Sequence, residues 1–416
     1  MKRKIAGVVF TLLPIYVTSQ QQFKAIDNLI ETGRYQIALQ ELNKIESSFK
    51  SNYKIATIYD ALDNHSKSVQ YYRKAISFKD DYRTKFKLAK SLKKAKKFRE
   101  ALKVYQEIVN ADSKNLLAKY DLSKLYLQLK QPKKTKKLLK ELIAEDSKNA
   151  NYHYQLGIAN ALLGKKFKKI DNFLDAYRID NQHFNAIEKL AKGFTKLKDK
   201  DSSAIFIEKG LELNPNHLDL NKLKINSLYI KKGYNESIVY LNHIDSLSPG
   251  EHYTHKMLGK SYYKLRNYPK ALEHFNKATK INAQDFTAYV YKGKIHLERN
   301  EIKEAMFSYG MATFVGKESR DEAHLGLAKV YMEMKLPKRA IDEFKRAVAE
   351  NHKNIKASYL LAKTSDDYYK DKKIGYKLYQ KYLERFEGRS TETDEFVKSR
   401  IKEIKKQHFL KGEILE

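Results

Sequence analysis

Residues 258–275 read LGKSYYKLRNYPKALEHF and contain the spacing that decides the fold. Apolar residues recur at helical spacing on both sides of Pro269, so the stretch predicts two short amphipathic helices around a turn. Two small residues, Gly259 and Ala271, lie twelve positions apart, and the bulky Phe275 follows Ala271 by about one helical turn. A small residue next to a large one lets two helices approach closely and interlock.

This spacing recurs along the chain at intervals of 30 to 35 residues. The positions equivalent to Ala271 are Ala38, Ser68, Ala101, Thr135, Lys169, Ser203, Ser237, Ala271, Ala305, Ala340 and Gly375. Four residues later every unit has a bulky apolar or aromatic side chain, from Leu42 in the first unit to Tyr379 in the last. Since neither helix of such a pair covers its own apolar seam, stacked pairs are expected to form a one-dimensional solenoid.

At these residues the chain resembles the tetratricopeptide repeat family, over about eleven tandem repeats in residues 20–383. The run Leu258-Gly259, Tyr262, Tyr268, Ala271, Phe275 matches the family's degenerate signature, although the usual Trp is absent throughout. The resemblance implies an all-α fold, a right-handed superhelical solenoid of helix-turn-helix units. Residues 384–394 read as a polar loop, and residues 395–416 as a C-terminal capping helix and tail that closes the exposed seam.

The first nineteen residues, MKRKIAGVVFTLLPIYVTS, have the layout of a secretory signal peptide. Three basic residues precede an apolar run that is shorter than the roughly 20 residues of a membrane span. We therefore expect an exported protein of the periplasm or cell envelope whose mature chain starts near Gln20 and has no transmembrane span. The alternatives are a short membrane anchor or an ordinary first helix.

Enzyme signatures are missing: the sequence has no phosphate-binding glycine loop, no GxSxG and no HExxH. The absence of cysteine excludes thiol catalysis, disulfides and thiolate zinc sites. His252 and His255 could share a helix face, but a metal site needs further ligands, and His255 falls at a packing position. We expect a non-catalytic protein without a metal or other cofactor.

The formal net charge of +32 favours a polyanionic partner. Lysine follows the first small residue of the repeat in seven units, at Lys90, Lys124, Lys192, Lys260, Lys294, Lys329 and Lys363. Aromatic residues lie one turn before it in early repeats, at Phe86, Tyr120 and Tyr154. In the family, the residue that follows this small residue is the ninth of the repeat. It lines the concave groove together with the second, fifth and twelfth residues. A lysine-rich composition, with lysine at every solvent-facing helix position, would explain this column of seven lysines equally well.

The leading interpretation is an interaction scaffold whose basic, partly aromatic groove holds a partner protein, preferably an acidic peptide segment. The alternative is a polymeric anion in the same groove, either a glycan or, in a cytosolic protein, nucleic acid. Export argues against nucleic acid, and an anionic membrane surface is a further candidate partner.

Overall fold

The computed structural model describes residues 19–315 and 319–413, with side chains from residue 21 onward. The predicted signal peptide therefore lies outside the described residues, apart from Ser19, at which the first helix begins. Within the described residues the secondary structure consists of helices alone, twenty-three of them, and the predicted all-α fold is confirmed.

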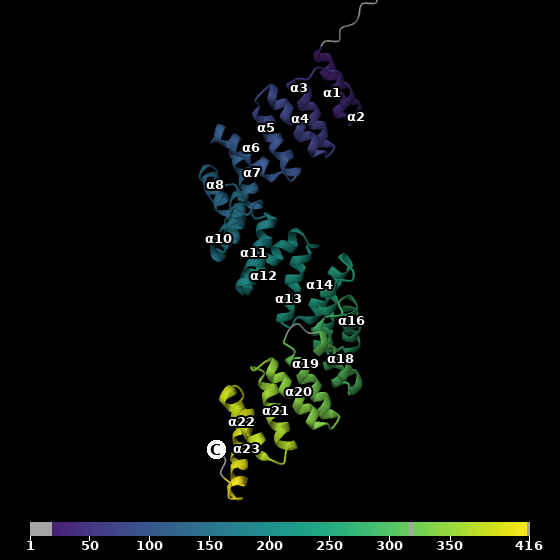
Figure 1. Cartoon of the computed structure of the whole chain (residues 1–416), viewed down its shortest axis with the longest axis vertical. Coiled ribbons are helices and arrows are strands. Elements are labelled where there is room, and N and C mark those ends of the chain that lie inside the picture. Colours follow the sequence, from purple (N-terminus) through teal and green to yellow (C-terminus); the bar gives the residue numbers. More distant parts are fainter. Residues whose placement is uncertain (1–18, 316–318, 414–416) are drawn as a thin grey trace, which may run out of the picture. The chain divides into compact units, whose positions relative to one another are not determined.

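The chain divides into two compact units, residues 1–197 and 198–416. In each unit, consecutive helices pack against one another in chain order (Figure 1). The helices of the first unit are α1 Ser19–Glu31, α2 Tyr35–Lys44, α3 Phe49–Ala61, α4 His65–Phe78, α5 Tyr82–Lys94, α6 Phe98–Ala111, α7 Leu116–Gln128, α8 Pro132–Glu145, α9 Ala150–Leu162, α10 Lys166–Ile179 and α11 Phe184–Leu197.

The helices of the second unit are α12 Lys200–Leu213, α13 Leu218–Ile230, α14 Tyr234–Leu247, α15 His252–Lys264, α16 Tyr268–Ile281, α17 Phe286–Glu298, α18 Ile302–Val315, α19 Asp321–Glu333, α20 Pro337–Glu350, α21 Ile355–Tyr368, α22 Lys372–Phe386 and α23 Thr391–Phe409. The odd-numbered helix comes first in each helix-turn-helix pair up to α22, and we call these the first helices.

Small and large residues interlock in the core, as predicted. A Cβ atom added at Gly259 would lie 2.7 Å from the Phe275 ring, and one at Gly293 would lie 2.8 Å from the Tyr309 ring. Both rings are buried, with relative exposures of 0% and 2%. The small residue of the first helix therefore leaves the space that the large residue of the second helix fills.

Several repeats depart from this rule. Lys169 occupies a small position but stays partly exposed, and the adjacent Ile170 is buried in its place. In α13 the small position is taken by Ile225, which is fully buried against Leu241 and Ile244. A branched side chain at that position fits because the residue four after Ser237 is leucine and not an aromatic ring.

Most turns inside the pairs use a left-handed residue one or two positions after the end of the first helix. Lys96, with φ of 60°, donates its N–H to the Lys93 carbonyl, while the N–H of Lys97 bonds to the Leu92 carbonyl. This pair of bonds satisfies the last carbonyls of α5. Glycine fills the turn at Gly33 and Gly164, whereas most other repeats place lysine, arginine, asparagine or aspartate there.

The C-terminal segment differs from the predicted boundaries. Helix α22 extends to Phe386, and α23 begins at Thr391, four residues before the expected start at Glu395. Glu392 and Asp394 lie in the first turn of α23, where carboxylates oppose the positive end of the helix dipole. The polar residues of the predicted loop therefore suit a helix start. Val397 and Ile404 are buried against α22 and its neighbours.

Candidate ligand-binding face of the first helices

The seven lysines of the predicted column all lie on first helices, three in the first unit and four in the second, and we call the surface that they line in each unit its lysine face. Lys90 and Lys363 are exposed, and the other five are partly buried. In the second unit, α15 contacts α17 and α17 contacts α19 directly, so the lysines of successive repeats lie on neighbouring helices.

The predicted pairing of rings and lysines is present in the first unit. The Lys90 Nζ lies 4.6 Å from the centre of the Phe86 ring, and the Lys124 Nζ lies 4.4 Å from that of Tyr120. Phe86 is only 8% exposed, because its ring packs edge-on against Tyr105 at 5.8 Å. It can therefore offer a ligand little more than a ring edge, and it is as much a core residue as a binding residue.

A cavity of about 510 Å³ opens beside Lys90. Its lining combines aromatic rings with basic side chains from α3, α4, α5 and α7: Tyr53, Thr57, Asp60, Tyr72, Tyr82, Arg83, Phe86, Lys87, Lys90, Lys94 and Leu117. Tyr82 and Leu117 are large side chains that remain exposed, at 41% and 56%. The cavity thus presents apolar area next to positive charge.

Two of the lysines are neutralised within their own helix. The Lys124 Nζ lies 2.6 Å from the Asp121 carboxylate, and Lys192 pairs with Glu188 one turn earlier. The ring of Tyr154 is engaged as well, because it packs 5.1 Å from His183 and 5.7 Å from Phe173. An anionic ligand would have to compete with these internal partners.

In the second unit, the rings beside the lysines come from other positions of the repeat. The Lys260 Nζ lies 4.7 Å from the centre of the Tyr229 ring, which belongs to the preceding first helix α13. Burial, followed by the charges of Lys256 and Lys264, lowers the pKa of Lys260. The ring of Tyr263 packs 5.0 Å from that of Tyr291, and Lys294 lies 5.0 Å from the Tyr291 ring.

These tyrosines were not among the predicted residues, whose rings lie at the fifth position of the repeat. Tyr229 and Tyr263 both lie four residues after the small position, which is the twelfth position that the family resemblance names. That signal was available in the sequence. The last lysine of the column, Lys363, lies 5.8 Å from the ring of Phe396 on α23.

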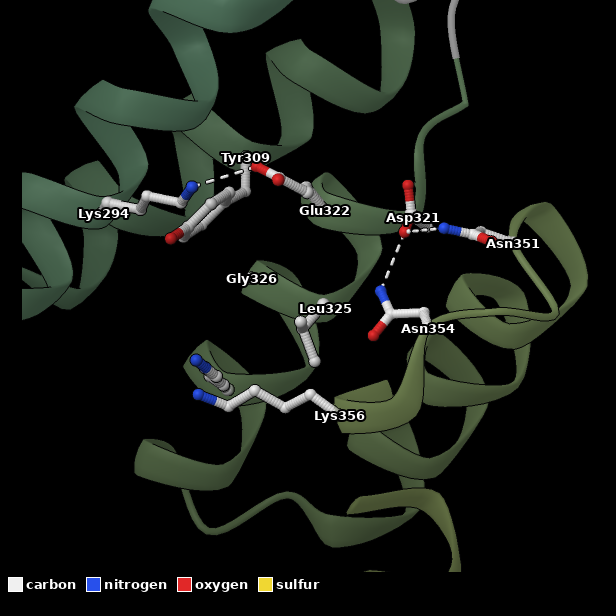
Figure 2. A pocket seen from close by; sticks show the side chains of 10 residues that line it. Lys294, Tyr309, Asp321, Glu322, Leu325, Gly326, Asn351, Asn354 and Lys356 are labelled. Atoms are coloured by element: carbon white, nitrogen blue, oxygen red, sulfur yellow. Dashed lines mark hydrogen bonds and ion pairs between the residues drawn. The ribbon is translucent and has the colours of Figure 1, made fainter. Parts of the chain in front are cut away.

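A second pocket, of about 350 Å³, lies between α17, α18, α19 and α21 (Figure 2). It is lined by Lys294, Tyr309, Asp321, Glu322, Leu325, Gly326, Lys329, Asn351, Asn354 and Lys356. The Lys294 Nζ bonds to the Glu322 carboxylate at 3.0 Å. The side-chain amides of Asn351 and Asn354 donate to Asp321 at 2.9 and 2.8 Å. Figure 2 shows these polar contacts at one side of the pocket and Lys356 at the other.

The surroundings of Lys329 alter its ionisation. Burial, the neighbouring Lys356 ammonium group and the charge of Lys294 lower its pKa to about 8. Within the described part of the chain, neither Lys329 nor Lys356 forms an ion pair with an acid. Lys356 occupies the second position of its repeat and was not among the predicted residues.

The described residues contain no group of three or more histidine, aspartate or glutamate side chains that could hold a metal ion. His255 is buried, and its Nδ1 lies 3.3 Å from the Nδ1 of His274, while His252 bonds to Asp285 at 2.6 Å. In residues 19–315 and 319–413, no helix is long and apolar enough to cross a membrane.

Sequence comparison gives three matches to models of one family, the tetratricopeptide repeat, at residues 49–82, 92–156 and 252–285. A tetratricopeptide repeat-containing protein of Methanocaldococcus jannaschii is 26% identical over 168 residues, which are 38% of this chain and 30% of that protein. Superkiller protein 3 of Schizosaccharomyces pombe is 23% identical over 193 residues, or 42% of this chain and 14% of that protein. The chain thus matches less than a third of the length of either curated relative.

Among solved structures, yeast Tom70 aligns with 93% of this chain and 96% of its own, at 13% identity and a TM-score of 0.43. The type IV pilus biogenesis factor PilW aligns with 50% of this chain and 96% of its own, at 15% identity and a TM-score of 0.43. The family matches coincide with repeats whose small and large residues interlock in the structure, including Gly259 and Phe275. Residues 49–82, 92–156 and 252–285 are therefore tetratricopeptide repeats.

Proposed function

We propose that this chain is an exported, non-catalytic scaffold of the bacterial cell envelope that binds an extended acidic segment of a partner protein along the lysine faces. The tetratricopeptide fold supports a role in protein–protein interaction. The export half of the proposal rests on residues 1–19, whose sequence has the layout of a signal peptide.

The observation that carries the binding half is the pairing of lysines with rings. Five of the seven lysines lie within 5.8 Å of an aromatic ring centre: Lys90, Lys124, Lys260, Lys294 and Lys363. The ammonium groups would attract an acidic chain and speed its association, and the rings would contribute apolar contact area. Within the described residues, Lys90, Lys260 and Lys363 have no acidic ion-pair partner.

The test uses a labelled peptide in which glutamate alternates with leucine, titrated against the full chain while fluorescence anisotropy is followed. Reversal of Lys90, Lys124 and Lys260 to Glu should abolish binding, and added salt should weaken binding to the wild type. The matched control reverses Lys103, Lys140 and Lys280, which are exposed lysines on the second helices of the same three repeats. Equal affinity in both triple variants would refute the role of the lysine faces.

A polymeric anion is the second candidate, because exposed rings beside lysines also bind chains through stacking and charge neutralisation. A sulfated glycan fragment in the same assay separates the two classes. Tighter binding of the glycan than of the peptide, with the same dependence on the three lysines, would favour the polymer. For localisation, cell fractionation and N-terminal sequencing should find a chain that begins near Gln20 in the envelope. An intact Met1 in the cytosol would contradict export and would return nucleic acid to the candidates.

A further inference from the structure

The pocket of Figure 2 differs from the rest of the second unit's lysine face in its charge balance. Three ammonium groups and two carboxylates line it. Glu322 is held by Lys294, and Asp321 accepts hydrogen bonds from Asn351 and Asn354. Lys329 and Lys356 are left facing the cavity without an acidic partner among the described residues.

Lys329 and Lys356 line the same pocket, and the positive charge of Lys356 acts on Lys329. Two ammonium groups repel each other and are both donors only, so neither can satisfy the other. A ligand with two negative charges placed between them would allow both groups to donate as ammonium ions. A ligand with a single negative charge would neutralise only half of that charge.

We infer that this pocket binds a doubly charged oxyanion of the phosphate monoester class between Lys329 and Lys356. The cavity of about 350 Å³ has room for such a group. Of the remaining lining residues, Tyr309 contributes a buried ring and Leu325 an apolar side chain. The inference refines the proposed function at two lysines, but it concerns a small anion and can fail or succeed independently of peptide binding.

Ligand charge is tested with a matched pair, phenyl phosphate and benzoate, titrated into the full chain by calorimetry. The second pKa of a phosphate monoester is about 6, so phenyl phosphate is a dianion above neutral pH while benzoate is a monoanion. Phenyl phosphate should bind about tenfold or more tightly than benzoate, because one further charge-assisted hydrogen bond is formed. Equal affinity for the two ligands would overturn the inference.

The pocket residues are tested with Lys329→Met and Lys356→Met, each of which should weaken phenyl phosphate binding by about tenfold or more. Lys345→Met is the control, because this exposed lysine on α20 lies outside the pocket. These variants keep Lys90, Lys124 and Lys260, so loss of phosphate binding with retained peptide binding separates this inference from the proposed function. Unchanged phosphate affinity in both pocket variants would refute it.

The pH dependence of phenyl phosphate binding is a further test, because a general loss of charge would not reproduce it. Lys329 faces Lys294, Tyr309, Asp321, Glu322 and Lys356 across the pocket, and its pKa is lowered to about 8. Binding should take up a proton, and affinity should fall about tenfold between pH 7 and pH 9. Lys329→Arg should keep the affinity at pH 7 and lose this pH dependence, since guanidinium stays charged. The same pH dependence in the arginine variant would contradict the assignment.

Discussion

Removal of the Arg400 guanidinium should loosen the C-terminal helix. Arg400 on α23 donates through Nε and Nη2 to the carboxylate of Asp366 on α21, at 2.6 and 3.3 Å. Asp366 is only 2% exposed. A Cβ added at Gly375 would lie 2.7 Å from the Cβ of Asp366, so the Asp366 side chain has little room to turn toward water. The charge of Asp366 therefore depends on partners supplied by other helices.

The magnitude follows from what remains after Arg400→Ala. Breaking a buried ion pair by removing one partner costs about 3–5 kcal/mol. Lys372 stays 3.6 Å from Asp366 and offsets part of the loss, which favours the lower end, about 3 kcal/mol. Val397 and Ile404 still pack against the last pair, so α23 should open more often while remaining docked most of the time. About 3 kcal/mol corresponds to roughly a hundredfold increase in the population of the opened helix.

Amide hydrogen exchange measured by mass spectrometry reads this opening directly. Peptides from α23 should exchange roughly a hundredfold faster in Arg400→Ala, while peptides from α3 and α4 keep their wild-type rates. Lys398→Ala is the control, since its ion pair with Glu387 lies on the surface and should matter little. Adding Asp366→Asn to Arg400→Ala should restore part of the protection by removing the buried charge. Wild-type exchange in Arg400→Ala, or no recovery in the double variant, would refute this reasoning.

Three further predictions concern the seam, the turns and the pocket, each read as the midpoint of urea unfolding. Gly259→Val should lower stability by about 1–3 kcal/mol, because its side chain would overlap the Phe275 ring; an unchanged midpoint would mean that the seam is loosely packed. Lys96→Gly should raise stability by about 1 kcal/mol, because Lys96 adopts a left-handed conformation that glycine adopts without strain. Lys329→Met should raise stability at pH 7 by about 1 kcal/mol after allowance for solvent screening. The lowered pKa of Lys329, about 8, disfavours its protonation in the folded state, so this gain should be full below pH 8 and should vanish as pH rises past about 10.4.

The seam of the solenoid could be predicted from the sequence because it depends on short, regular spacings. Gly259 and Phe275 meet through one turn between two helices of fixed length, so their contact follows from their separation alone. The same reasoning placed the lysine column on the first helices. It failed at Lys169, where a neighbouring isoleucine could enter the seam instead, and at the start of α23, where carboxylates suited to a helix N-terminus read as loop.

The surroundings of the lysines could not be predicted in the same way. Tyr229 lies beside Lys260 because two successive first helices approach each other, and their separation and angle are not encoded in any single column of the repeat. The same holds for Glu322 beside Lys294 and for Lys356 beside Lys329, since each contact joins residues of adjacent repeats. A repeat alignment gives the residues that share a helix face, whereas their partners depend on how the repeats stack.

These contacts change what the net charge means for binding. Asp121, Glu188 and Glu322 already hold Lys124, Lys192 and Lys294, so a ligand that binds there must replace an existing ion pair and gains little. Lys90 and Lys363 are exposed beside rings and have no such competitor among the described residues. A column of seven equal charges in the sequence is therefore a set of unequal sites in the folded chain. An acidic partner should take its register from the few unpaired lysines next to rings, and the total charge should mainly set how fast it arrives.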